Sequence, residues 1–151
     1  LAKDLKKPIR EVESPLAQME TMMGWSTDLQ EMMLTSTLAT DQNRYCKETA
    51  KLYELWCQGD EKALRKEINR EQVIFGVSDT EKKNIRTLLD EYNKGMYTDR
   101  NKKMLDVAIS YLESKDTVFY AVGLAHLLDD TSGLVDALRQ AGYTVEPVQY
   151  A

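Results

Sequence analysis

Residues 117–127 read TVFYAVGLAHL, and the rest of the chain is organised around this stretch. Its first six residues form a mainly apolar, β-branched and aromatic run, which predicts a buried strand. Gly123 then lets the backbone turn. His126, the only histidine in the chain, follows three residues later. This order predicts an imidazole at the carboxyl end of a sheet, the edge where open α/β sheets bind ligands.

Two further strands are predicted near the ends of the chain. Residues 8–13 alternate, with Ile9 and Val12 apolar, and residues 144–148 are predicted to form the last strand, where Pro147 suits an edge position. The strands must pair, because a lone strand leaves its backbone hydrogen-bonding groups unsatisfied. We therefore predict an α/β (α+β) fold in one domain over residues 1–151. Its small β-sheet is built from strands near both chain ends, around a large helical middle.

The middle of the chain carries the signals of helices. Residues 27–30 and 78–81 resemble capping boxes, and a break is expected near Thr40-Asp41. Residues 73–77 are apolar and fit either a loop or a turn of helix. A set of methionines recurs at the spacing of one helix face, which favours core packing over an adaptable binding surface. These methionines are Met19, Met22, Met23, Met32 and Met33.

Composition excludes several classes of function. The 151 residues carry a net charge of −5 and no dense stripe of lysine and arginine, so nucleic acid is not an expected partner. No apolar run approaches the roughly 20 residues needed for a transmembrane helix. Cys46 and Cys57 lack the spacing of a zinc pair. On one helix they would lie about 16 Å apart, too far for a disulfide.

Three polar residues are candidate partners of His126. Pairing the two chain ends would bring Glu13, at the carboxyl end of its strand, toward the imidazole; the alternative is a solvated or helix-capping Glu13. Arg100 and Asn101 lie in the first turn of a helix, where arginine opposes the helix dipole. An acid such as Glu13 could hold Arg100, and a solvated arginine is the alternative. For His126 the alternative is a core histidine bonded to a backbone carbonyl.

Several of these segments, taken together, resemble the TraB/GumN family, which also includes the animal Tiki proteins. The resemblance covers nearly the whole chain in the correct order, and it is most specific in the last third. The matching segments are residues 7–14, the Trp-Cys-Gln-Gly-Asp turn at 56–60, Asp99-Arg100-Asn101, residues 117–127, Gly133-Leu134 and residues 142–146.

The resemblance implies a metal-dependent hydrolase of the peptidase type, since Tiki proteins are regarded as metalloproteases. The family pattern contains two Gly-x-x-His motifs, a glutamate and an arginine–asparagine pair. Gly123 and His126 match the second motif, which implies that His126 binds a divalent metal. Glu13 would be a second ligand or the general base. Arg100 would stabilise an oxyanion or anchor a substrate carboxylate, and Asn101 would orient a ligand or donate to the substrate.

The first Gly-x-x-His motif is absent from the chain, which begins at Leu1. We therefore expect an N-terminally truncated fragment that is inactive alone and metal-free, with a divalent metal in the complete protein. A peptide or protein substrate is expected. A homodimer could cover an exposed sheet edge, and the family favours an extracytoplasmic or membrane-anchored location. The rival hypothesis is a non-catalytic module that binds a protein or peptide through its helical surface.

Overall fold

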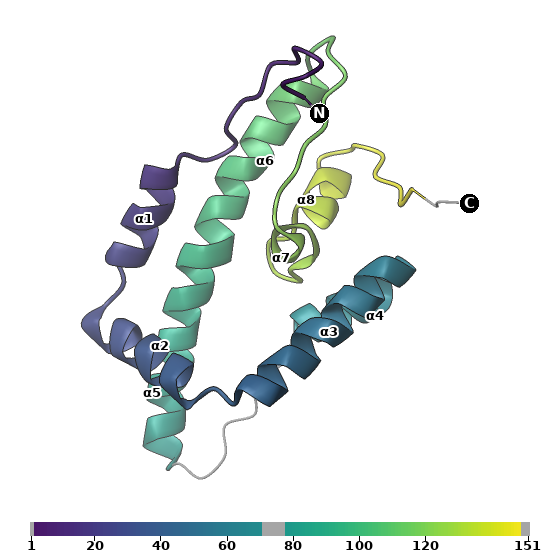
Figure 1. Cartoon of the computed structure of the whole chain (residues 1–151). Helices are drawn as coiled ribbons and strands as arrows, with labels where there is room; N and C mark the ends of the chain where they lie inside the picture. Colours follow the sequence, from purple (N-terminus) through teal and green to yellow (C-terminus); the bar gives the residue numbers. More distant parts are fainter. Residues whose placement is uncertain (1, 71–77, 149–151) are drawn as a thin grey trace.

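The computed structural model describes residues 2–70 and 78–148 (Figure 1). Within these ranges the chain forms eight α-helices and one π-helix. The predicted loop or helical turn at residues 73–77 lies outside them. The helices are α1 (Pro15–Met23), α2 (Thr27–Ala39), α3 (Gln42–Gln58), α4 (Glu61–Ile68), α5 (Asp79–Asn93), the π-helix η1 (Lys94–Thr98), α6 (Asp99–Leu112), α7 (Leu124–Leu128) and α8 (Leu134–Gln140).

The predicted α/β fold is wrong, because no residue in the described ranges belongs to a strand. Residues 8–13, 117–122 and 144–148 lack regular secondary structure. No backbone hydrogen bond found among the described residues involves 117–122. An apolar run predicts a strand locally, but a sheet also requires a second backbone at the spacing and register of a ladder. The run cannot provide that neighbour, so the predicted sheet does not form among these residues.

The segment before His126 instead lies against a helix. Figure 1 shows it running back along α6 from the end of that helix to the start of α7. The Tyr120 hydroxyl donates a 2.8 Å hydrogen bond to the carbonyl of Met104 on α6. Burial raises the pKa of Tyr120 to about 12, which keeps this hydroxyl protonated. Residues 117–122 therefore position His126 beside α6 although they do not belong to a sheet.

The long rod of the molecule is formed by α5, η1 and α6 in direct succession (Figure 1). It begins with the predicted capping box: the Ser78 hydroxyl accepts from the Glu81 N–H, and the Glu81 carboxylate accepts from the Ser78 N–H. The π-helix inserts a wider turn where α5 meets α6. Such turns inside α-helices occur frequently at functional sites.

The remaining helices pack along this rod in two groups. On one flank α1 contacts η1 and α2 contacts α5; on the other, α8 contacts α6 and α7. The predicted break separates α2 from α3, and α3 pairs with α4 as a hairpin that reaches the body through α7. The buried apolar side chains come from both groups and the rod. They are Leu29, Leu64, Met104, Ala108, Leu128 and Leu134.

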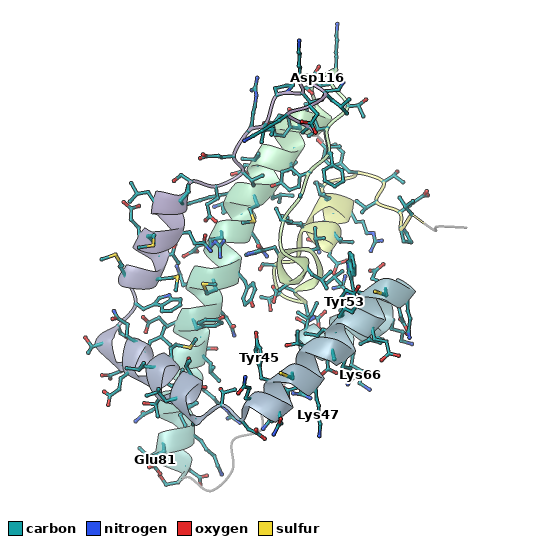
Figure 2. The ribbon with its side chains drawn as sticks, viewed as in Figure 1. Tyr45, Lys47, Tyr53, Lys66, Glu81 and Asp116 are labelled. Carbon is teal, nitrogen blue, oxygen red and sulfur yellow. The ribbon has the colours of Figure 1, made fainter. Side chains whose placement is uncertain are left out.

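The methionines of α1 do not pack in the core, contrary to the expectation from their spacing. Met19, Met22 and Met23 are exposed, and Met23 keeps 74% of its surface accessible. On α2, Leu38 is 79% exposed. Figure 2 shows Tyr45 and Tyr53 projecting from α3, and both are exposed. No helix in the described ranges is long and apolar enough to cross a bilayer.

Candidate functional site

The four residues predicted for the site come together at one end of α6. Glu13 lies just before α1, Arg100 and Asn101 occupy the first turn of α6, and His126 lies on α7. Glu13, Arg100 and His126 line a pocket of about 500 Å³, which Met96 and Gly123 also line. Asn101 is only 1% exposed and contacts His126. Helix packing therefore produces the juxtaposition that was predicted from pairing strands.

Arg100 and Glu13 form a bidentate ion pair. The Nε atom donates to both carboxylate oxygens, at 2.9 and 3.0 Å, and Nη2 donates to Oε2 at 2.7 Å. The third nitrogen, Nη1, donates to the Met96 carbonyl at 3.4 Å. Arg100 is 7% exposed, so the pair is largely shielded from water. The predicted contact between Arg100 and Glu13 is confirmed, and two of the three guanidinium nitrogens donate to the carboxylate.

His126 is held by a side chain rather than by a backbone carbonyl. Its Nδ1 lies 2.6 Å from Oδ1 of Asn101. The Asn101 amide nitrogen donates to the carbonyl and the hydroxyl of Ser132, at 3.0 and 3.1 Å. Because a carbonyl can only accept, the amide nitrogen must face Ser132 and Oδ1 must face His126. Nδ1 therefore carries the proton, which leaves the lone pair on Nε2.

The surroundings of His126 favour its neutral form. Burial is the main cause that lowers its pKa below 6.5, and the positive charge of Arg100 adds to it; Glu13 and Asp129 act in the opposite direction. The Tyr97 ring packs against the imidazole at a centroid distance of 5.6 Å. The backbone N–H of His126 donates to the Gly123 carbonyl at 3.0 Å, which fixes the backbone of the Gly-x-x-His motif.

The residues at the pocket fit a metal only in part. His126 resembles a metal ligand, because ligating histidines donate their other ring N–H to an oxygen acceptor. Glu13 is the second donor of the prediction, but both its oxygens already accept from Arg100. Within residues 2–70 and 78–148 there is no group of three or more His, Cys, Asp or Glu side chains suited to a metal. Catalytic zinc sites typically have about three protein ligands.

Three contact residues of the site were not predicted. Met96 and Tyr97 reach Arg100 and His126 from the π-helix, and the sequence carries no periodicity signal for this wider turn. Ser132 was absent from the predicted site, although its place after Asp129 in Asp-Asp-Thr-Ser-Gly resembles a turn in which a carboxylate accepts from the following backbone. In the fold Gly133 occupies the cap position of α8, and Ser132 is free to bond Asn101.

A larger cavity of about 910 Å³ lies elsewhere, between the end of α4, the helix α5 and residues 129–131. None of the four predicted residues lines it. Cavity volume alone would therefore point to this larger cavity as the functional site. The ion pair and the oriented imidazole point instead to the pocket beside His126.

The fold and this pocket define a helical protein with a single oriented histidine beside a buried arginine–glutamate pair. A family model described as TraB/PrgY/gumN matches residues 1–147, and the chain belongs to this family. The family predicted from the sequence is thus confirmed. A comparison with curated proteins and a comparison with solved structures each returned no match.

Proposed function

We propose that this chain carries the histidine side of a metal-dependent hydrolase site, with a peptide or protein as the substrate class that the family resemblance implies. The observation that supports it is the state of His126: a neutral imidazole whose Nδ1 proton is held by Asn101, with Nε2 unbonded among the described residues. An imidazole in this state is a good ligand for divalent transition metals.

Each predicted residue has a task in this proposal. His126 offers Nε2 to a divalent cation, and Asn101 fixes the plane of its ring. A divalent cation held there would supply Lewis acidity toward a substrate carbonyl. Glu13 accepts a proton from water or offers a second oxygen, while Arg100 holds its carboxylate in place. Further ligands would be water, substrate or groups outside the described residues.

The test is metal content after equilibrium dialysis against Zn²⁺ or Mn²⁺, measured for wild type, His126→Ala and Glu13→Gln. Glu11→Gln is the matched control, since Glu11 is an exposed carboxylate two residues from Glu13. As isolated, the chain is expected to carry no metal; after dialysis with the cation in excess we expect bound metal in wild type and in Glu11→Gln, and none in His126→Ala. Glu13→Gln should lose metal if Glu13 is a ligand and keep it if Glu13 is the general base. Wild type that stays metal-free after this dialysis, or full retention of metal by His126→Ala, would contradict the proposal.

A non-catalytic module that binds a protein or peptide is the second candidate, and the exposed apolar side chains of α1 and α2 favour it. Met23 and Leu38 are among the most exposed apolar side chains of the chain, and such exposed patches often mark interaction surfaces. This function predicts binding that survives chelators and Glu13→Gln but is weakened by Met23→Ser or Leu38→Ser. The homodimer stays a prediction, which sedimentation velocity would test. The extracytoplasmic or membrane-anchored location also stays a prediction.

A further inference from the structure

We propose that Asp129 and Ser132 are positioning residues that set the tautomer of His126 through Asn101. Four side chains form one continuous line of hydrogen bonds, from the Asp129 carboxylate through the Ser132 hydroxyl and the Asn101 amide to Nδ1 of the imidazole. The line gives Asp129 and Ser132 a role in the site, although neither lines the pocket. Its value for catalysis rests on the proposed function; its effect on the imidazole does not.

The line begins at a turn built around Asp129. One carboxylate oxygen, Oδ2, accepts from the Ser132 N–H at 2.6 Å, the Ser132 hydroxyl at 2.8 Å and the Thr131 N–H at 3.2 Å. The hydroxyl proton of Ser132 is thereby directed at Asp129. The Ser132 hydroxyl oxygen then has only lone pairs left to offer Asn101, so the serine accepts a hydrogen bond from the Asn101 amide.

The Asn101 side chain continues the same donor-to-acceptor order from Ser132 to His126. Its amide nitrogen faces two acceptors, the hydroxyl and the carbonyl of Ser132, and its side chain is buried. A flipped amide would set its own oxygen against those acceptors and leave the buried groups unsatisfied. The amide is therefore locked with Oδ1 toward His126.

The locked amide selects one of the two neutral forms of the imidazole. At 2.6 Å, Oδ1 of Asn101 requires a proton on Nδ1, and the Nε2–H tautomer would place two lone pairs against each other. With Nδ1 protonated, Nε2 is the nitrogen available to a cation or a proton. The Ser132 hydroxyl, oriented by the Asp129 carboxylate, thus acts together with the Ser132 carbonyl to decide which ring atom can react.

Nitrogen NMR of the metal-free protein with ¹⁵N-labelled histidine tests this directly, because the chain has one histidine and gives one pair of ring signals. Ser132→Ala removes the hydroxyl link, Asp129→Ala removes the start of the line, and Ser132→Thr restores the hydroxyl. Ser110→Ala and Asp106→Ala, at exposed positions of α6, are matched controls.

We expect the Nδ1–H tautomer in wild type, in Ser132→Thr and in both controls. In Ser132→Ala and Asp129→Ala the share of the Nε2–H form should rise about fivefold, the scale of one lost hydrogen bond. An Nε2–H form in wild type, or a wild-type spectrum in folded Ser132→Ala, would overturn the inference. If Asp129→Ala does not fold, the wild-type and Ser132 spectra decide. Since no metal is present, failure here is separate from failure of the metal test.

Discussion

His126 is constrained by three neighbours of different kinds. Asn101 accepts from Nδ1, Tyr97 packs against the ring, and the charge of Arg100 disfavours a second proton on it. None of these contacts occupies Nε2. The residue thus combines a fixed orientation with one unused nitrogen, which distinguishes it from a histidine whose two nitrogens are both satisfied inside a core.

The lowered pKa of His126 predicts a pH dependence of stability. The unfolded chain binds a proton near pH 6.5, whereas the folded chain binds it only at lower pH, so protonation favours unfolding as pH falls below about 6.5. With EDTA present, the free energy of unfolding in urea should drop more between pH 7.5 and 5.5 for wild type than for His126→Gln. Equal drops would contradict it. The carboxylates with lowered pKa, such as Glu91, titrate below 4.5, outside this window.

The Arg100–Glu13 pair predicts an asymmetric response to substitution. Glu13→Ala would leave the largely buried guanidinium without its partner, at a cost of about 3–5 kcal/mol in the free energy of unfolding. Adding Arg100→Met should recover most of that loss, because an apolar side chain of similar length needs no partner. Urea unfolding of the two variants, with exposed Glu11→Ala as the control, measures this. A double variant no more stable than Glu13→Ala would contradict the argument.

At the scale of elements, the turn between α7 and α8 places the hydrogen-bond line. A Cβ atom at Gly133 would overlap the Asp129 carbonyl oxygen and lie 2.8 Å from that of Leu127. At Gly123 a Cβ atom would meet only the His126 ring, at an ordinary 3.5 Å. The two glycines therefore differ in kind: Gly133 is required by close backbone packing, and Gly123 is not.

This difference is testable by two matched substitutions. Gly133→Ala should lower the free energy of unfolding by about 1–3 kcal/mol, the range for overpacked sites. Gly123→Ala should change it by about 0.5 kcal/mol or less, since its φ of −61° also suits alanine. Thermal or urea unfolding of both variants gives the comparison. An equal loss in the two variants would show that the packing at Gly133 is not what requires its glycine.

The elements also show what the sequence could and could not predict. The capping box at 78–81 and the break at 40–41 are local, and both predictions are confirmed. The strand at 117–122 was wrong as a strand, because pairing depends on a distant backbone that no local pattern contains. The predicted neighbours of His126 were nevertheless correct: it lies beside Arg100 and Asn101, because α6 and α7 both pack against α8 and Asn101 bonds the imidazole. No sequence pattern indicated the π-helix, so Tyr97 was not predicted as a residue of the site.

At the scale of the whole molecule, the α3–α4 hairpin is attached to the rest by few contacts. Arg65 donates to Asp136 at 2.7 Å and to Asp130 at 3.2 Å. Asn69 donates to the Leu128 carbonyl at 2.9 Å and accepts from the Asp130 N–H at 2.9 Å. Three of these four bonds end on residues 128–130, the segment that contains Asp129, and the fourth ends on α8. The hairpin and the site are therefore held by the same segment.

Loss of these bonds should loosen the hairpin as a unit. In Asn69→Ala we expect faster amide exchange throughout α3 and α4 and little change in the middle of α6, because local openings follow contiguous cooperative units. Hydrogen–deuterium exchange followed by mass spectrometry measures both regions at once. Lys66→Ala, an exposed change on the same helix, is the control. Uniform acceleration over the whole chain would contradict a separable hairpin.

The most direct test of the account is the nitrogen spectrum of His126 as Zn²⁺ is added to the protein. Zn²⁺ binds imidazole nitrogen readily, and the single histidine removes any ambiguity of assignment. We predict that the Nε2 signal shifts and saturates at one equivalent, while Nδ1 keeps its proton toward Asn101. A spectrum unchanged by excess Zn²⁺, or binding through Nδ1, would contradict the claim that this pocket presents His126 as a metal ligand.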